Sequence, residues 1–396
     1  MKQNQIIFLV IWLMALIAWS PLVYAGAVKV SPDSYQTLGV DENNLPIFYQ
    51  QLKDKLTFPL SWNSGKYANF NAWRKTAKNK VIEQALIFPD HTSFTPQVID
   101  EQDQGSYIAR KVAFNITAES RVQALMLVPK GKGPFPAVLL LHDHGAKFDI
   151  GKEKMIAPWD DEVKSKSAKA WSDKYFSGRF VGNELAERGY VVLAVDALGW
   201  GDRGGIRYEN QQALASNLLS MGTSLAGIMA HEDMRSADFL ASLPEVDKSR
   251  VGAMGFSMGA YRAWQVAALS DSIKVGVAVC WMTTTKGVMV PGNNILRGQS
   301  SFYMTHSGLV NYLDYPDIAS IAAPKPMLFY NGDADGLFPV NSVKDAYRQM
   351  HQVWQSQKAD DRLETKNWSG LGHVFVKEEQ EEAFQWLDHW LQPAIH

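Results

Sequence analysis

A serine flanked by two glycines, at a point where a strand gives way to a helix, constrains this chain more than any other feature. The stretch begins at Arg250 and reads RVGAMGFSMGAYRAW. Its first half is a continuous apolar run, typical of a buried strand, and its second half repeats apolar residues at helical spacing. Gly255, Ser257 and Gly259 fit the pattern G-x-S-x-G, in which the serine occupies a strained turn that admits no larger neighbour. The pattern predicts a nucleophilic serine; the alternative is an ordinary helix N-cap.

The chain around this serine alternates strands with helices. Segments that read as strands lie at 136–141, 190–197, 250–257, 274–281, 324–332 and 362–370. Most of them are followed by a segment with helical periodicity. Such alternation predicts an α/β fold with a mostly parallel central sheet and helices on both faces. Because sites in such sheets form at the carboxyl ends of strands, the residues directly after each run are the candidates for chemistry.

The first 25 residues have the composition of a secretory signal peptide. An apolar run from Ile6 to Trp19 follows Lys2, and residues 23–25 offer small side chains where a signal peptidase reads. The run is shorter than the roughly 20 residues that span a bilayer. We therefore expect an exported protein, periplasmic or secreted, that keeps no membrane span; an uncleaved anchor is the alternative.

The remaining chain is expected to form a helical N-terminal extension over 26–105 and a catalytic domain over 106–396. The segment at about 282–317 separates two strands by more than a usual connection and reads as an insert. The only cysteine, Cys280, cannot form an internal disulfide and is expected to be a buried apolar residue. The net charge of −2 gives no basic surplus for binding nucleic acid.

A serine nucleophile needs a base, and the base needs an acid. Of the nine histidines, only His373 lies directly after the last strand and late in the chain. Asp333 and Asp335 both follow the preceding strand; Asp335 is the favoured acid, and Asp333 is expected to shape the turn through its own backbone bonds. Ser257, Asp335 and His373 thus stand in the order of a serine, acid and histidine triad.

A tetrahedral intermediate also needs two hydrogen-bond donors for its oxyanion. The backbone N–H of Met258, directly after the serine, is the expected first donor. The second is expected from the loop after the strand at 136–141, where His144 is the first choice and Asp143 and Gly145 remain open.

Two further motifs could indicate that the chain binds a cofactor. Gly199, Gly201 and Gly204 fit G-x-G-x-x-G, but no acidic residue stands about 20 positions further on, as a dinucleotide site requires. His142 and His144 could share one ion, yet no further histidine cluster completes a metal site. The sequence therefore predicts neither a metal nor another cofactor.

With these residues in view, the chain from about Tyr107 onward resembles α/β hydrolases of the dienelactone hydrolase and acetyl xylan esterase-like branch. The resemblance rests on LLLHDHGAKF, ERGYVVLAVDALGWGDRG, EVDKSRVGAMGFSMGA, NGDADGLFP and GLGHVF. Dienelactone hydrolase itself uses cysteine where this chain has Ser257, so the resemblance favours the serine esterases. The N-terminal extension is similar to that of secreted bacterial members, several of which act on polysaccharides.

The expected function is hydrolysis of a carboxylic ester through an acyl-enzyme, with a small or carbohydrate-linked substrate. Trp281, Phe302 and Tyr303 are candidates for the substrate pocket, and core packing is the alternative for each. A serine peptidase of the prolyl oligopeptidase kind and a non-catalytic binding protein are the rival functions. The sequence does not indicate an oligomeric state.

Overall fold

The structure, a computed structural model, describes residue 39 and residues 48–205, 207–290 and 299–392. The predicted signal peptide, 1–25, lies outside the described residues, as does 291–298 of the predicted insert. The chain divides into two compact units, residues 1–52 and residues 53–396. Within the first unit the structure describes Gly39 and residues 48–52, where helix α2 (Tyr49–Asp54) begins. The second unit holds the sheet and all candidate site residues.

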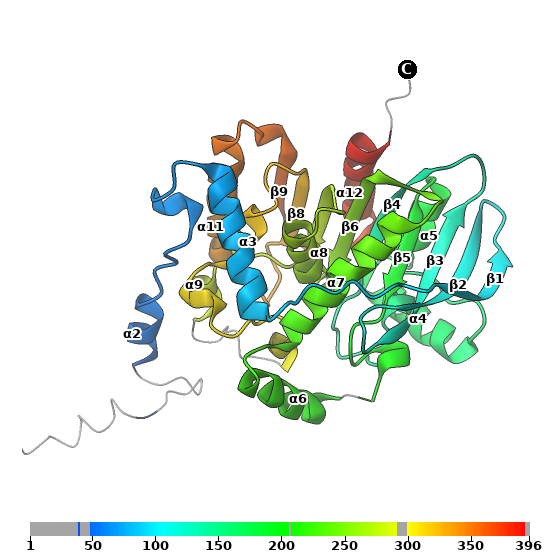
Figure 1. Cartoon of the computed structure of the whole chain (residues 1–396), viewed down its shortest axis with the longest axis horizontal. Helices are drawn as coiled ribbons and strands as arrows, with labels where there is room; N and C mark the ends of the chain where they lie inside the picture. Colours follow the sequence, from blue (N-terminus) through cyan, green and yellow to red (C-terminus); the bar gives the residue numbers. More distant parts are fainter. Residues whose placement is uncertain (1–38, 40–47, 206, 291–298, 393–396) are drawn as a thin grey trace, which may run out of the picture. The chain divides into compact units, whose positions relative to one another are not determined.

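A nine-stranded sheet forms the centre of the second unit (Figure 1). Its strands are β1 (Gln97–Asp103), β2 (Tyr107–Asn115), β3 (Arg121–Pro129), β4 (Phe135–Leu141), β5 (Val191–Val195), β6 (Val246–Phe256), β7 (Val275–Val279), β8 (Met327–Gly332) and β9 (Leu363–Trp368). They lie in the order β1-β2-β3-β5-β4-β6-β7-β8-β9. In this spatial order, the first three pairings (β1-β2, β2-β3 and β3-β5) are antiparallel, and all the pairings from β5-β4 to β8-β9 are parallel. The predicted mostly parallel sheet is confirmed.

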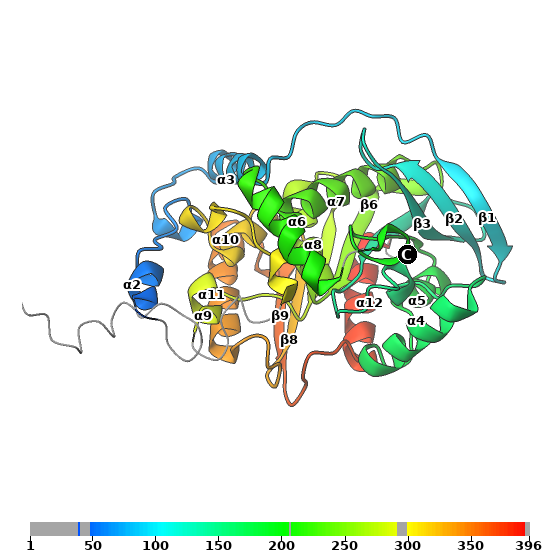
Figure 2. The ribbon, with the colours of Figure 1, turned by 90° about the horizontal axis from the view of Figure 1, so that it is seen from below.

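Helices cover both faces of this sheet (Figure 2). One face carries α4 (Glu162–Tyr175), α5 (Val181–Glu187) and α12 (Lys377–Leu391); the other carries α3 (Phe70–Ala85), α6 (Tyr208–Ser220), α7 (Leu225–Ser242), α8 (Met258–Leu269), α10 (Tyr315–Ser320) and α11 (Val340–Ser356). Strand residues alternate between the two cores, as the period of two requires. In β4, Leu139 and Leu141 face one core, and Val138 and Leu140 face the other.

The N-terminal region differs from the predicted helical extension over 26–105. Helix α3 begins after Asn69, whose side chain accepts a hydrogen bond from the Ala72 N–H, and it buries Trp73 and Val81 in the core of the sheet. The region ends in β1, which pairs with β2. Nearly every position of β1 is exposed, so its sequence QVIDEQD lacks the apolar alternation that marks a strand. Residue 105 is therefore not a boundary between compact units.

Two segments between β4 and β6 carry further helices. The polar insertion after β4 contains the short 3-10 turn η3 (Lys152–Lys154) and helix α4. The chain from Tyr208 to Ser242 forms two helices, α6 and α7, which meet at 85°. They are separate because Gly222 has a positive φ of 85° and Ser224 caps the second helix. Within the described ranges no single helix is long and apolar enough to cross a bilayer, and only this bent pair meets that criterion jointly.

Short elements make up the rest of the described chain. They are the helix α9 (Thr285–Val288) and the 3-10 turns η2 (Trp62–Ser64), η4 (Gly201–Arg203), η5 (Gln299–Tyr303), η6 (Leu309–Asn311) and η7 (Asp360–Arg362). The expected insert at about 282–317 contains α9, η5 and η6 and ends within α10.

Candidate active site

Ser257 occupies the tight turn between β6 and α8. Its φ of 56° and ψ of −124° are a strained combination for a residue with a side chain. A Cβ on Gly255 would lie 2.1 Å from the Gly259 carbonyl oxygen, and a Cβ on Gly259 would lie 1.9 Å from the Leu141 carbonyl oxygen. The two glycines therefore let β6, α8 and the end of β4 approach one another around the serine.

The side chain of Ser257 does not cap the helix that it precedes. Ser257 stands at the N-cap position of α8 but makes no side-chain cap bond. Its Oγ lies 2.8 Å from His373 Nε2 instead. This contact overturns the N-cap alternative for the serine.

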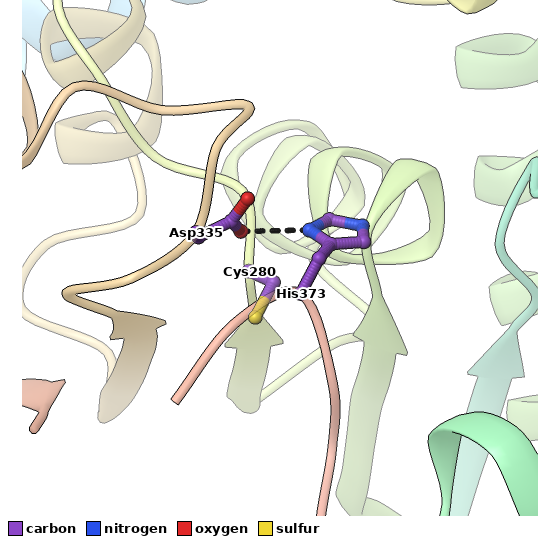
Figure 3. A group of neighbouring side chains, drawn as sticks. All are labelled: Cys280, Asp335 and His373. Atoms are coloured by element: carbon purple, nitrogen blue, oxygen red, sulfur yellow. Dashed lines mark hydrogen bonds and ion pairs between the residues drawn. The ribbon is translucent and has the colours of Figure 1, made fainter. Parts of the chain in front are cut away.

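His373 and Asp335 complete a continuous hydrogen-bonded chain. His373 Nδ1 lies 2.7 Å from Asp335 Oδ2 (Figure 3). The Asp335 side chain is fully buried, and its other carboxylate oxygen accepts from the Leu337 N–H at 2.9 Å. With Asp335 ionised, the neutral imidazole carries its proton on Nδ1 and offers Nε2 to accept the serine proton. The structure thus brings Ser257, His373 and Asp335 together.

Asp333 has a different place from Asp335. Its Oδ1 accepts from the Gly370 N–H at 2.6 Å, and its own N–H donates to the Trp368 carbonyl oxygen at 3.0 Å. Asp333 therefore joins the acid loop to the loop that carries His373, rather than shaping its own turn as the sequence suggested.

Cys280 lies beside this pair. Its Sγ, Asp335 and His373 offer ligand atoms within 4.8 Å of one another (Figure 3), a spacing that a metal ion could bridge. The thiol, however, is fully buried and lies 3.4 Å from the Val374 carbonyl oxygen. Burial, together with the Asp335 carboxylate, raises the pKa of Cys280 well above its ordinary value, so the protonated thiol is a poor ligand. Cys280 packs as the small apolar residue that the sequence predicted.

The predicted oxyanion donors belong to two different elements. Met258 is the first residue of α8, and the first N–H groups of a helix have no partner within it. The loop after β4 begins at His142 and lies close to the turn that carries Ser257 (the elbow), because a Cβ on Gly259 would lie 3.1 Å from the His142 carbonyl carbon. The expected second donor, His144, lies in this loop.

The two loop histidines are neutral and bonded to protein partners. His142 Nε2 accepts from the Ala197 N–H at 2.9 Å, and its Nδ1 donates to the Asp143 carbonyl oxygen at 2.9 Å. His144 Nδ1 accepts from the Ala146 N–H at 3.1 Å. Burial, with the nearby Lys154 charge, lowers the pKa of His144 to about 4. The ring nitrogens of His142 are thus committed to protein partners rather than aimed at a shared ion.

The three predicted pocket residues differ in exposure. Trp281 is only 4% exposed and packs edge-on against Tyr261 and Tyr315. Tyr303 is fully buried, with its ring centroid 5.6 Å from that of His144. Phe302 is half-buried against the same core. In this structure Trp281 and Tyr303 are core residues, although Tyr303 touches the loop that holds the expected oxyanion donor.

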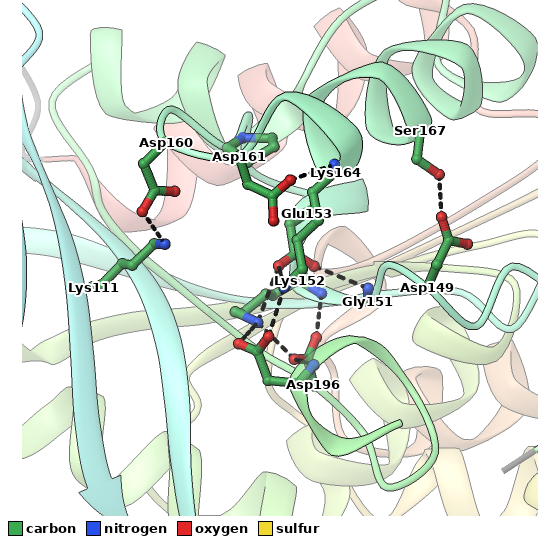
Figure 4. A network of polar contacts seen from close by, with 12 residues as sticks. Lys111, Asp149, Gly151, Lys152, Glu153, Asp160, Asp161, Lys164, Ser167 and Asp196 are labelled. Atoms are coloured by element: carbon green, nitrogen blue, oxygen red, sulfur yellow. Dashed lines mark hydrogen bonds and ion pairs between the residues drawn. The ribbon is translucent and has the colours of Figure 1, made fainter. Parts of the chain in front are cut away.

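Sequence reasoning missed a network of buried charges behind that loop (Figure 4). Lys152 Nζ lies 2.6 Å from both Asp196 Oδ2 and Asp202 Oδ2. Lys164 Nζ lies 2.9 Å from Glu153 Oε1 and 2.6 Å from Asp202 Oδ1. The run KEK inside a polar insertion reads as a solvated turn, and nothing in its spacing signals burial. The glycine-rich sequence GWGDRG, which supplies Asp202, is part of this network.

The fold and the hydrogen-bonded chain at the rim of its sheet define an α/β hydrolase. The chain belongs to the Abhydrolase family, whose model matches residues 46–365. A curated protein of Bacillus subtilis, "Putative hydrolase YtaP", is 29% identical over 304 residues, which are 76% of this chain and 95% of the relative.

Solved structures share the fold at low sequence identity. A "putative acetyl xylan esterase" from Bacteroides fragilis has a TM-score of 0.63 and 19% identity, covering 86% of this chain and 87% of its own. A glucuronoyl esterase from Solibacter usitatus has a TM-score of 0.57 and 13% identity, covering 89% and 96%. At these identities the likeness establishes the α/β-hydrolase fold.

Proposed function

We propose that this chain is a serine carboxylic ester hydrolase that acts through an acyl-enzyme. The observation that carries the proposal is the unbroken chain from Asp335 through His373 to Ser257, with contacts of 2.7 and 2.8 Å. A buried carboxylate, an imidazole and a strained serine are the groups that acyl transfer requires in that order.

The proposed reaction has two steps. His373 Nε2 takes the Ser257 proton while Oγ attacks the ester carbonyl carbon, and the imidazolium then gives that proton to the departing alcohol. Water, deprotonated by the same nitrogen, attacks the acyl-enzyme and releases the acid. In both steps the Met258 N–H and an N–H of the loop after β4 stabilise the negative oxygen.

Carbohydrate-linked esters are the proposed substrate class. The similar solved structures are described as an acetyl xylan esterase and a glucuronoyl esterase, and the resemblance of the sequence motifs points the same way. We further propose that Phe302 and Tyr303, which lie in the turn η5 of the insert, contribute to substrate choice through the contact of Tyr303 with His144. We also propose that the protein is exported, on the composition of its first 25 residues.

Replacement of Ser257 tests the proposal directly. Ser257→Ala should lower turnover of p-nitrophenyl acetate by at least about 10³-fold and abolish labelling by a fluorophosphonate probe. Wild-type protein should label at Ser257 and hydrolyse esters without measurable turnover of matched peptide amides; efficient cleavage of the amides would favour a peptidase. Near-normal ester turnover by pure Ser257→Ala would overturn the mechanism.

A panel of acetyl, feruloyl, glucuronoyl and short acyl esters identifies the substrate class. N-terminal sequencing of protein from a periplasmic extract tests export, with cleavage after Ala25 as the expected result.

A further inference from the structure

A fully buried lysine, Lys154, lies behind the loop that follows β4. Its Nζ donates to the carbonyl oxygens of Asp143 at 2.8 Å and His144 at 3.0 Å. It also lies 3.4 Å from Asp143 Oδ2 and 5.0 Å from the centre of the Trp171 ring. The side chain is 0% exposed, and such burial of an ammonium is costly unless the group is paired and hydrogen-bonded.

The two carbonyls that Lys154 holds belong to the peptides of the candidate oxyanion donors. The Asp143 carbonyl shares its peptide with the His144 N–H, and the His144 carbonyl shares its peptide with the Gly145 N–H. In a trans peptide the C=O and N–H groups point to opposite sides. An ammonium on the carbonyl side therefore fixes the direction in which each N–H points.

The same contact also polarises these N–H groups. A cation bound to a carbonyl oxygen polarises the whole peptide group, and hydrogen bonds in such a chain strengthen one another. The N–H on the far side becomes a stronger donor to a developing oxyanion. Because the ammonium is held in place before the reaction, no reorganisation is needed when charge appears.

We propose that Lys154 is a positioning residue for the oxyanion hole, which orients and polarises the peptides of residues 143–145. The inference rests on the proposed function, and it gives the Lys154 ammonium an indirect part in stabilising the oxyanion. It holds whether His144 or Gly145 supplies the donor. The third open candidate, Asp143, has its N–H in the peptide of the His142 carbonyl, which lies 3.5 Å from Arg262 Nη1.

The surroundings of Lys154 hold its ammonium in place and favour its charged form against the effect of burial. Burial lowers the pKa of Lys154, but the Asp143 carboxylate opposes this shift. That carboxylate also accepts from Trp171 Nε1 at 3.0 Å. Trp171 also packs closely against the loop, since a Cβ on Gly145 would lie 2.2 Å from its ring.

Substitution of Lys154 by methionine tests this role, because methionine keeps the length of the side chain and removes its donors. We expect kcat for p-nitrophenyl acetate to fall by about 10- to 100-fold, with KM within about twofold. Lys154→Arg should recover part of the loss. The control is Lys164→Met, which removes an ammonium of the neighbouring charge network that touches neither carbonyl, and its kcat should stay within about twofold of wild type.

A second measurement reads the oxyanion itself. An aryl trifluoromethyl ketone forms a hemiketal when Ser257 Oγ bonds to its carbonyl carbon and the serine proton passes to His373. The pH dependence of the ¹⁹F signal gives the pKa of the hemiketal hydroxyl, which an intact oxyanion hole lowers. Lys154→Met should raise that pKa by about one unit or more, and Lys164→Met should leave it unchanged.

The outcomes separate this inference from the proposed function. If wild-type Ser257 neither labels with fluorophosphonate nor forms the hemiketal, the proposed function fails. If wild type does both and Lys154→Met keeps the wild-type hemiketal pKa, Lys154 has only a structural role and the inference is overturned. Should Lys154→Met not fold, Lys154→Gln takes its place under the same criteria, with an intermediate rise of the hemiketal pKa expected from its remaining amide donor.

Discussion

The two sides of Ser257 are held in place by different physical means. On one side, close backbone packing around Gly255 and Gly259 fixes the turn that carries Ser257, and the close approach of Gly332 to Leu371 and Gly372 joins the loop of Asp335 to the loop of His373. On the other side, the loop after β4 and the turn η3 are fixed by buried ammonium and carboxylate groups. Adding a single methyl group destabilises a tightly packed backbone. Removing one charge destabilises a buried ion network, because the opposite charge is then buried without a partner.

The largest effect is expected on the triad side, from loss of the acid. Asp335→Asn keeps the shape of the side chain but destabilises the required imidazole tautomer and the imidazolium. We expect kcat to fall by roughly 10⁴-fold, which corresponds to about 5.5 kcal/mol. The control is Asp333→Asn, which should cost less than about tenfold because Asp333 only joins two loops. Equal losses in the two variants would show that Asp335 acts through loop structure alone.

The next effect is steric. Gly259→Ala would place a methyl 1.9 Å from the Leu141 carbonyl oxygen, a backbone atom that cannot move without shifting β4. We expect the free energy of unfolding to fall by more than about 4 kcal/mol, measured by urea denaturation. Gly336→Ala is the control on the same rim, since its Cβ would meet no atom within 4 Å. A Gly259→Ala variant as stable as the control would show that the elbow is looser than this packing implies.

The difference between backbone packing and buried ion pairs explains which features could be predicted from the sequence. Close packing leaves a local signature: Gly255 and Gly259 flank Ser257 within five residues, and Asp335 and His373 each follow a predicted strand. The α/β fold, the sheet and the residues that converge on Ser257 could therefore be predicted. The partners of a buried ion network leave no such signature, because Lys152 meets Asp196, which lies 44 positions further along the chain.

The remaining misses have similar physical causes. Strand β1 is exposed on both faces at one edge of the sheet, so its residues follow no apolar period. Trp281 directly follows a strand, as a pocket residue could, but only the tertiary packing against Tyr261 and Tyr315 shows that it is buried. Position in the chain indicates which edge of the sheet a side chain reaches, not how much of it neighbouring helices cover.

Removal of one buried ammonium should destabilise the ion network. Lys152→Met leaves Asp196 buried and without its ammonium partner, and breaking a buried pair in this way costs about 3–5 kcal/mol. We expect a loss of about 3 kcal/mol in the free energy of unfolding. Lys164→Met is the matched control, because its side chain is 25% exposed and its loss should stay below about 1 kcal/mol. Similar losses for both lysines would mean that water reaches the Lys152 site.

The smallest effect is a dependence on pH at the rim of the same network. Although partial burial opposes ionisation, Lys152 and Lys164 hold the pKa of Asp202 at about 2. A carboxylate with a lowered pKa stabilises the fold above its ordinary pKa of 3.8, and this contribution is lost as the pH falls through about 2. Asp202→Asn should therefore flatten the fall in unfolding free energy between about pH 4 and about pH 2.

The expected difference is below about 1 kcal/mol, because the Asp202 side chain is 34% exposed and solvent screens its pairs. Urea unfolding at several pH values measures it, with Asp345→Asn as the control, since that carboxylate belongs to an exposed pair with Arg348. In about 1 M salt the difference should shrink, as the Debye length falls to about 3 Å. A difference that salt does not change would show that Asp202 is shielded from solvent ions, as the buried charges of the network are.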